Sequence, residues 1–124
     1  MKKNKSKEID RRVDPRIYHE LPLYIAANGY DFKTTTQNIS CSGAYCQIKK
    51  YIPPFTKLAI KMTLPIKKNN KKEKIDIKCK GVIVRSDDTT KNGFNIAIFF
   101  NEISENQREK IAQYIHQYLP EKIC

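Results

Sequence analysis

Apolar and polar residues alternate along much of this chain, and the alternation predicts β-strands. It is clearest over residues 57–64, where every second side chain is apolar. Because successive side chains of a strand point to opposite faces, this segment has one core face and one wet face. Residues 75–83 alternate likewise, and Gly81 is expected to mark a bulge or a close backbone approach at which the buried face switches.

Four shorter segments complete a set of six expected strands. Residues 21–26 form an apolar run that is closed by Asn28-Gly29, a dipeptide typical of two-residue hairpin turns. The other three strands are expected at residues 32–39, 44–48 and 94–100. Six short antiparallel strands in a chain of this size indicate a small closed barrel, since closure removes exposed strand edges.

One helix is expected after the strands. Ser104 and Gln107 have the spacing of a capping box, and Pro120 supplies a stop. An apolar stripe recurs at every fourth position: Ile111, Ile115 and Leu119. The stripe predicts that the helix docks against the barrel.

The 124 residues indicate one domain. Residues 1–9 are polar and lysine-rich and are expected to form a flexible tail, followed by a barrel domain over residues 10–124 whose first part, 10–20, is an arm. The sequence has neither the long apolar stretch of a membrane helix nor the apolar core of a secretory signal. We therefore expect a cytoplasmic protein without membrane insertion.

The charge is strongly positive, with 24 Lys and Arg against 13 Asp and Glu and a net charge of +11. The basic residues gather in the first two-thirds of the chain, which favours an anionic partner such as a nucleotide, nucleic acid or phospholipid. The lysine run over residues 67–74 is interpreted as a solvated hairpin loop.

Catalytic and metal chemistry find little support in the residues. Cys41, Cys46, Cys79 and Cys124 lack the spacing of a zinc site and are interpreted as free buried thiols. No nucleophile turn or phosphate-binding loop is present, and only two histidines exist. The sequence therefore predicts a protein that is not an enzyme and has no metal or cofactor.

Two local motifs carry the candidate chemistry. Arg11, Arg12 and Arg16 lie in a segment where Pro15 disfavours helix, and the planar fork of arginine suits phosphate or the O6/N7 edge of guanine. The second motif runs over residues 38–43, between two strands. It offers an amide, a hydroxyl and a backbone that can approach a ligand: Asn38, Ser40 and Gly43. Each motif alone is also explained as a basic tail or a serine turn.

Together the motifs resemble the two-part signature of the PilZ domain, a bacterial receptor for cyclic di-GMP. R-x-x-x-R matches at Arg12 and Arg16, and [DN]-x-S-x-x-G matches at Asn38, Ser40 and Gly43. Residues 81–85 and 93–100 are similar to the last two strands of that family. The resemblance implies a mainly β fold, a six-stranded antiparallel β-barrel of split-barrel/Greek-key type with a C-terminal α-helix.

The resemblance also implies a function. Arg12 and Arg16 would close over cyclic di-GMP, with Arg11 as an additional contact, while Asn38 and Ser40 bind it from the barrel and the glycine of the second motif leaves room. Signalling would then pass through an unknown downstream protein partner.

Two other functions stay open at this point. One is a small basic barrel that binds RNA or single-stranded DNA through exposed aromatic residues. Phe94 and Phe100 share parity with the isoleucines of their strand and are expected to be buried, so nucleic acid is the less favoured partner. The other is a PilZ-like adaptor that contacts proteins without any ligand.

Overall fold

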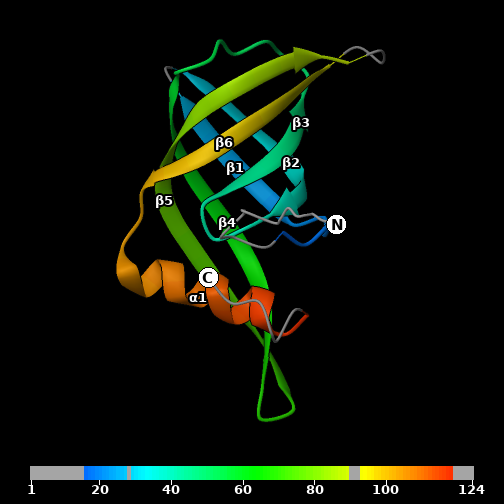
Figure 1. Cartoon of the computed structure of the whole chain (residues 1–124), viewed down its shortest axis with the longest axis vertical. Helices are drawn as coiled ribbons and strands as arrows, with labels where there is room; N and C mark the ends of the chain where they lie inside the picture. The colour runs from blue at the N-terminus through cyan, green and yellow to red at the C-terminus, as the bar shows by residue number, and fades with distance from the viewer. Residues whose placement is uncertain (1–15, 28, 90–92, 119–124) are drawn as a thin grey trace, which may run out of the picture.

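A closed barrel of six antiparallel strands forms the body of the protein (Figure 1). The computed structural model describes residues 16–27, 29–89 and 93–118. The strands are β1 (Pro22–Ala27), β2 (Tyr30–Ile39), β3 (Gly43–Ile48), β4 (Lys57–Lys68), β5 (Lys71–Asp88) and β6 (Phe94–Glu102), followed by α1 (Glu105–His116). They close in the order β1-β2-β3-β6-β5-β4. The expected fold class is confirmed.

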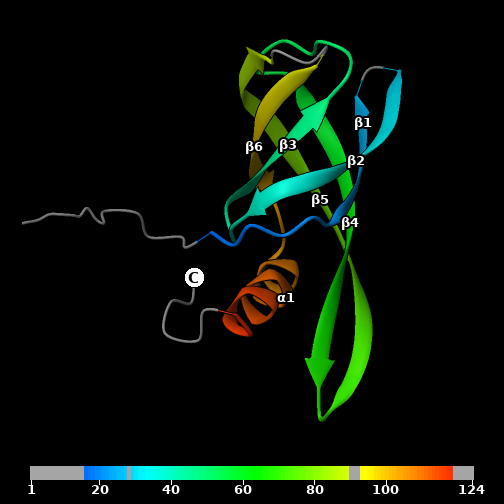
Figure 2. The same cartoon turned by 90° about the vertical axis from the view of Figure 1, so that its right-hand side faces the viewer.

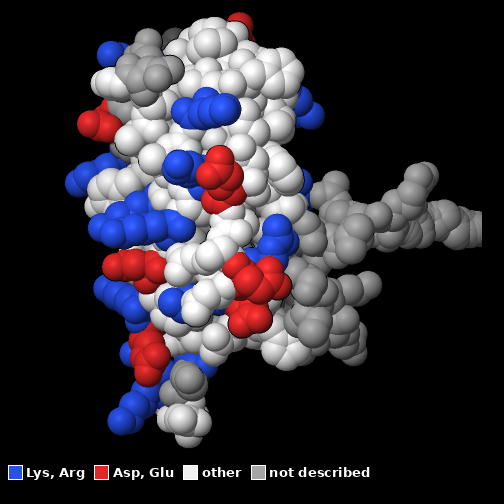
Figure 3. Space-filling view, turned by 90° about the vertical axis from the view of Figure 1, so that its left-hand side faces the viewer, with Lys and Arg blue, Asp and Glu red and all other residues white. Residues whose placement is uncertain are grey.

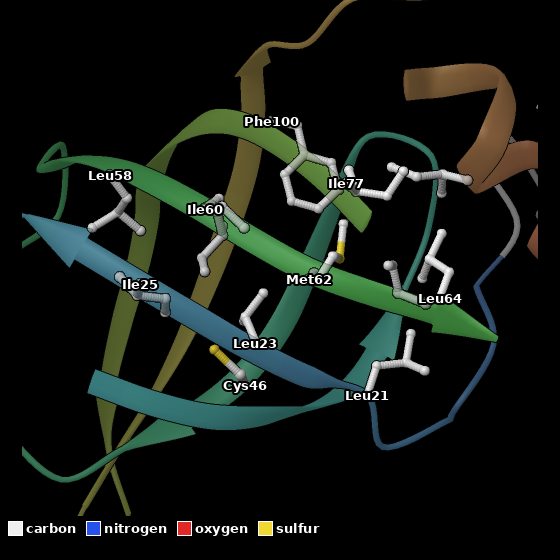
Figure 4. Close-up of a cluster of buried hydrophobic side chains, with 14 of the residues drawn as sticks. Leu21, Leu23, Ile25, Cys46, Leu58, Ile60, Met62, Leu64, Ile77 and Phe100 are labelled. Atoms are coloured by element: carbon white, nitrogen blue, oxygen red, sulfur yellow. The ribbon is translucent and has the colours of Figure 1, made fainter. Parts of the chain in front are cut away.

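The inner faces of the strands form one core. Alternate residues of β1 and β4 point inward and meet side chains from β3, β5 and β6 (Figure 4). The buried members that Figure 4 labels are Leu21, Leu23, Ile25, Cys46, Leu58, Ile60, Met62, Leu64, Ile77 and Phe100. Phe100 is 2% exposed, as its parity predicts, and therefore does not form an aromatic platform on the surface. Phe94, expected to be buried as well, is only partly buried against the core.

The β4–β5 hairpin extends beyond the barrel and below α1 (Figure 2). The expected lysine-rich loop over residues 67–74 is therefore wrong. Only Asn69 and Asn70 form the turn, with φ of 53° and 63°, the left-handed conformations that a two-residue hairpin turn requires. The pattern failed because polar residues occupy both faces of the hairpin tip, so no alternation marks the strands.

Gly81 sits where β5 bulges against β6. A Cβ atom there would lie 2.7 Å from Ile60 Cδ1 and 2.8 Å from Ile98 Cγ2, so the expected close approach is confirmed. The expected switch of the buried face is wrong, because Gly81 and Ile83 both stay on the inner face and Val84 is exposed. The extra residue shifts β5 relative to its neighbour without changing its own alternation.

Helix α1 packs against β4 and β5. The Gln107 backbone N–H donates to Ser104 Oγ at 3.2 Å, which confirms the N-cap. The other half of the capping box is wrong, because Gln107 Oε1 accepts a hydrogen bond from the Lys78 backbone at 2.8 Å and so ties the helix to β5. Leu119 lies outside the described residues. The rest of the stripe is buried together with a tyrosine: Ile111, Tyr114 and Ile115.

The cysteines differ from one another. Cys46 and Cys79 are free thiols, and desolvation raises the pKa of Cys46 to about 12 and that of Cys79 to about 11. Cys41 is disulfide-bonded, so the expectation of a free thiol is wrong there. Cys124 lies outside the described residues. Disulfide pairing depends on proximity in the folded chain, which spacing along the sequence does not reveal.

Candidate ligand-binding site

The segment before β1 is fixed to the barrel beside β2. Ile17 and Ile39 form an antiparallel bridge with two backbone hydrogen bonds of 3.0 Å. Thr36, which is fully buried, accepts from the Leu21 backbone N–H at 2.9 Å and donates to the His19 carbonyl at 2.6 Å. These bonds satisfy backbone groups that would otherwise be buried without partners. The described end of the arm is thus anchored next to the end of β2.

Arg16 is held at this anchor and contacts the second sequence motif. Its Nη1 donates to Asn38 Oδ1 at 2.7 Å, across 22 positions of sequence. Asn38 is 9% exposed and follows a register shift between β2 and β3. The fold therefore joins one residue of each motif. Arg11 and Arg12 lie outside the described residues.

Ser40 and Gly43 shape the turn between β2 and β3. Ser40 is 1% exposed, its backbone N–H donates to the Gly43 carbonyl at 2.8 Å, and its Oγ accepts from the Ser42 backbone at 3.2 Å. A Cβ atom on Gly43 would overlap the carbonyl oxygen of Ile98. The glycine is therefore required where β3 meets β6.

An open hollow of about 560 Å³ lies beside this turn. Strands β3, β5 and β6 supply its floor, and the arm supplies one edge. Two aromatic side chains are exposed there, Tyr18 at 76% and Phe99 at 46%. The residues of the hollow that could contact a ligand are Arg16, Tyr18, Asn38, Tyr45, Arg85 and Phe99.

Arg85 brings a second guanidinium to the hollow. Its Nε donates to Asp87 Oδ2 at 2.9 Å. This hydrogen bond, the Asp87 charge and, to a smaller degree, Tyr45 raise the pKa of Arg85. Asp87 offsets part of the Arg85 charge. The hollow still combines two guanidinium groups with aromatic side chains, and these groups suit an anion that bears aromatic rings.

Four residues of the hollow were missed from the sequence: Tyr18, Tyr45, Arg85 and Phe99. Tyr18 lies two residues after Arg16, at a position that the motif does not specify. Phe99 has the parity opposite to Phe100, and that signal could have marked it as an outward aromatic residue. Nothing local distinguishes Tyr45 or Arg85, because they reach the hollow only through the pairing of β3 and β5 with β6.

Among the residues the structure describes, no cluster of His, Cys, Asp and Glu could hold a metal ion. No helix in the described ranges is long and apolar enough to cross a membrane.

A small closed barrel carries a hollow with two arginines at the end of β2, which is the architecture of a candidate ligand-binding module. A family model of the PilZ domain matches residues 10–117, and the chain belongs to the PilZ family. This family comprises bacterial receptors for cyclic di-GMP that are generally not catalytic.

Two solved structures share the fold. The chain is similar to the Bacillus subtilis inhibitor of motility, MotI/DgrA, with a TM-score of 0.77 and 21% identity over 94% of this chain and 55% of that one. It thus spans about half the length of that protein. The PilZ domain of CeSA from a cellulose-synthesizing bacterium has a TM-score of 0.53 and 19% identity over 86% of this chain and 96% of that one. No curated protein sequence matches the chain significantly.

Proposed function

We propose that this protein is a cytoplasmic, non-enzymatic receptor for cyclic di-GMP that orders its N-terminal arginine arm around the dinucleotide and signals through a partner protein. The observation that carries the proposal is the hydrogen bond between Arg16 and Asn38, at the edge of the hollow. It joins Arg16, the last residue of R-x-x-x-R, to Asn38, the first residue of N-x-S-x-x-G, and this supports a ligand site that both motifs share.

The chemistry of the hollow suits a cyclic dinucleotide. Arg16 offers a guanidinium fork for a phosphate or for the O6/N7 edge of guanine, and Arg85 offers a second. Phe99 and Tyr18 expose ring faces on which a purine can stack. Asn38 holds the arginine fork by its carbonyl oxygen, and its amide N–H groups can donate to the ligand.

The remaining motif residues take supporting roles in this proposal. Arg12 closes over the ligand from the arm, with Arg11 as an additional phosphate contact. Ser40 and Gly43 fix the shape of the turn beneath the ligand, which keeps Asn38 in position.

Signalling follows from the position of the arm. Ligand binding can shift a conformational equilibrium only as far as its affinity differs between the two states. An arm whose arginines contact the ligand supplies that difference, and a partner that recognises the ordered arm then responds to the second messenger.

The test is calorimetric titration with cyclic di-GMP at near-physiological salt. GTP and a short RNA are titrated separately as control ligands. We expect saturable binding of cyclic di-GMP at micromolar or lower Kd. The variants R12A/R16A and R85A should weaken it at least tenfold, since charge-assisted hydrogen bonds are lost. R108A, on helix α1 and outside the hollow, is the matched control and should bind as the wild type does.

Several results would refute the proposal. Absence of cyclic di-GMP binding by folded protein would exclude the receptor function. Equal loss of affinity in R108A and R85A would show that only net charge matters. Tighter binding of RNA than of cyclic di-GMP would favour a nucleic-acid-binding barrel.

A further inference from the structure

A second concave surface lies on the outside of β2, β1, β4 and β5. It is a groove of about 590 Å³, and it shares no lining residue with the hollow described above. Figure 3 shows lysine and arginine side chains along one side of the molecule, from the barrel toward the hairpin tip, with acidic side chains between some of them. The groove and the lysines that line it together indicate a surface with a function of its own.

Strand register explains the floor of the groove. Ala26 of β1 is paired with Ala59 of β4, and both side chains point outward. Asp31 of β2 is paired with Ala26, and Lys80 of β5 with Ala59. Two methyl groups thus sit between longer side chains, which leaves a shallow apolar depression in the middle of the sheet.

The next row of outward residues forms a basic rim. Tyr24 is paired with Lys33 on one side and with Lys61 on the other, and Lys61 is paired with Lys78. The Lys33 ammonium lies 5.3 Å from the centre of the Tyr24 ring, a cation–π contact. Three lysines and one tyrosine therefore run side by side across four strands.

The pairing of Lys61 with Lys78 is unfavourable within the protein itself. Like charges directly opposite each other on an antiparallel pair destabilise it. Among the described residues, no ion pair joins either lysine to an acid. Lys80, by contrast, forms an ion pair in which its Nζ lies 3.9 Å from Glu102 Oε1. A sheet face that keeps such a pair gains from an external negative charge.

We propose that this groove is a docking site for an acidic segment of a partner protein. Carboxylates of the segment pair with Lys61, Lys78 and Lys33, and a small apolar side chain between them rests on Ala26 and Ala59. The proposal builds on the receptor function by giving it a partner surface, and it does not require the nucleotide site.

The shape and composition of the groove favour a peptide segment over other anions. A flat lipid surface cannot reach a floor of two alanines beneath a rim of lysines. A nucleic-acid strand needs several stacking aromatics, and Tyr24 is the one aromatic residue lining this groove. Asp31 at one end would repel a phosphate backbone, whereas a peptide can place a lysine or an amide beside it.

The test is an NMR titration of the ¹⁵N-labelled full chain with a synthetic 12-residue peptide in which glutamates flank a central Ala-Leu pair. We expect amide shifts on β1 and β4 around Ala26 and Ala59. The variant K61E/K78E should weaken binding about tenfold, since two exposed ion pairs become repulsive. K71E/K72E changes the charge equally at the hairpin tip and should leave the affinity within twofold of the wild type.

Each further outcome decides the proposal. Absence of shifts at these residues, or equal weakening by K71E/K72E, would overturn it. So would tighter binding of a single-stranded oligonucleotide or of phosphatidylglycerol vesicles at the same lysines. Cyclic di-GMP titrations of K61E/K78E should match the wild type. If the peptide binds and cyclic di-GMP does not, the receptor function fails and the docking site stands.

Discussion

Substitution of Gly43 by alanine should destabilise the barrel even without ligand. A Cβ atom there would overlap the Ile98 carbonyl oxygen and lie 3.2 Å from its carbon and 3.4 Å from Phe99 Cα. These neighbours are backbone atoms of β6, which is paired with β3, so no flexible side chain can move away. The two strands must separate by roughly 1 Å to restore the 3.0 Å that Cβ contacts require.

The expected cost is about 3 kcal/mol, at the upper end of the range for overpacking in a well-packed region. For a domain of this size it lowers Tm by about 10 °C. Urea and thermal unfolding followed by circular dichroism, with no nucleotide present, measure both quantities. Gly29→Ala is the control, because φ is +85° there and nothing lies within 4 Å of a Cβ atom, so only a backbone cost of about 1 kcal/mol applies.

One result would refute this reasoning. If Gly43→Ala loses less stability than Gly29→Ala while its affinity for cyclic di-GMP falls tenfold or more, the glycine serves the ligand and not the contact between strands. A loss of stability in the expected range, with a nucleotide affinity that falls only as the folded fraction does, would establish the packing role.

Three further predictions concern stability. Thr36→Val should lower the free energy of unfolding by about 2–3 kcal/mol in urea, because two buried backbone groups lose their partner, whereas the exposed Thr35→Val should change it little. Ser104→Ala should lower the free energy of unfolding by about 1 kcal/mol through loss of the N-cap, and an unchanged midpoint of urea unfolding would contradict that role. Burial raises the pKa of Cys46 from 9.0 to about 12 and that of Cys79 from 9.0 to about 11, so the unfolded chain loses these thiol protons at lower pH than the folded protein does. The stability that the two buried thiols contribute is therefore fully present below pH 9 and is lost as the pH rises toward those values. Unfolding in urea at pH 8–10.5 should show a smaller pH-dependent loss in Cys46→Ala than in the wild type.

The strands that the sequence predicts well are those with one buried face. In β4, the apolar residues alternate with exposed or half-buried ones, and the structure buries all four: Leu58, Ile60, Met62 and Leu64. The hairpin tip was missed because no buried face exists there to impose a period of two. Gln107 was assigned to a capping box from spacing alone. Its amide oxygen instead accepts a hydrogen bond from the backbone N–H of Lys78 in β5, a neighbour that only the tertiary fold provides.

The candidate site divides in the same way. Arg16 and Asn38 could be linked in advance because both belong to motifs with a defined spacing, and their hydrogen bond agrees with that link. Arg85 and Tyr45 lie on strands whose sequences carry no such marker. They reach the hollow because β6 pairs with both β3 and β5, and the register of a barrel is set by the whole core rather than by any local pattern.

Strands β5 and β2 each line both the hollow and the groove. Of these two, β2 also holds the arm, through Thr36. Asn38 lies at its C-terminal end beside the arm, and Asp31 and Lys33 lie near its start at the groove. Thr36 lies between these two ends of β2 and holds the arm by its hydrogen bonds to Leu21 and His19. The register between β2 and β3 shifts directly after Thr36. Because coupling between two binding sites is reciprocal, any factor by which cyclic di-GMP changes the affinity for an acidic peptide must equal the factor by which the peptide changes the nucleotide affinity. If the strand register stays as it is, a factor well above one requires the arm or its bonds to Thr36 to rearrange. Loss of that factor in Thr36→Val, with both separate affinities retained, would place the coupling at this anchor.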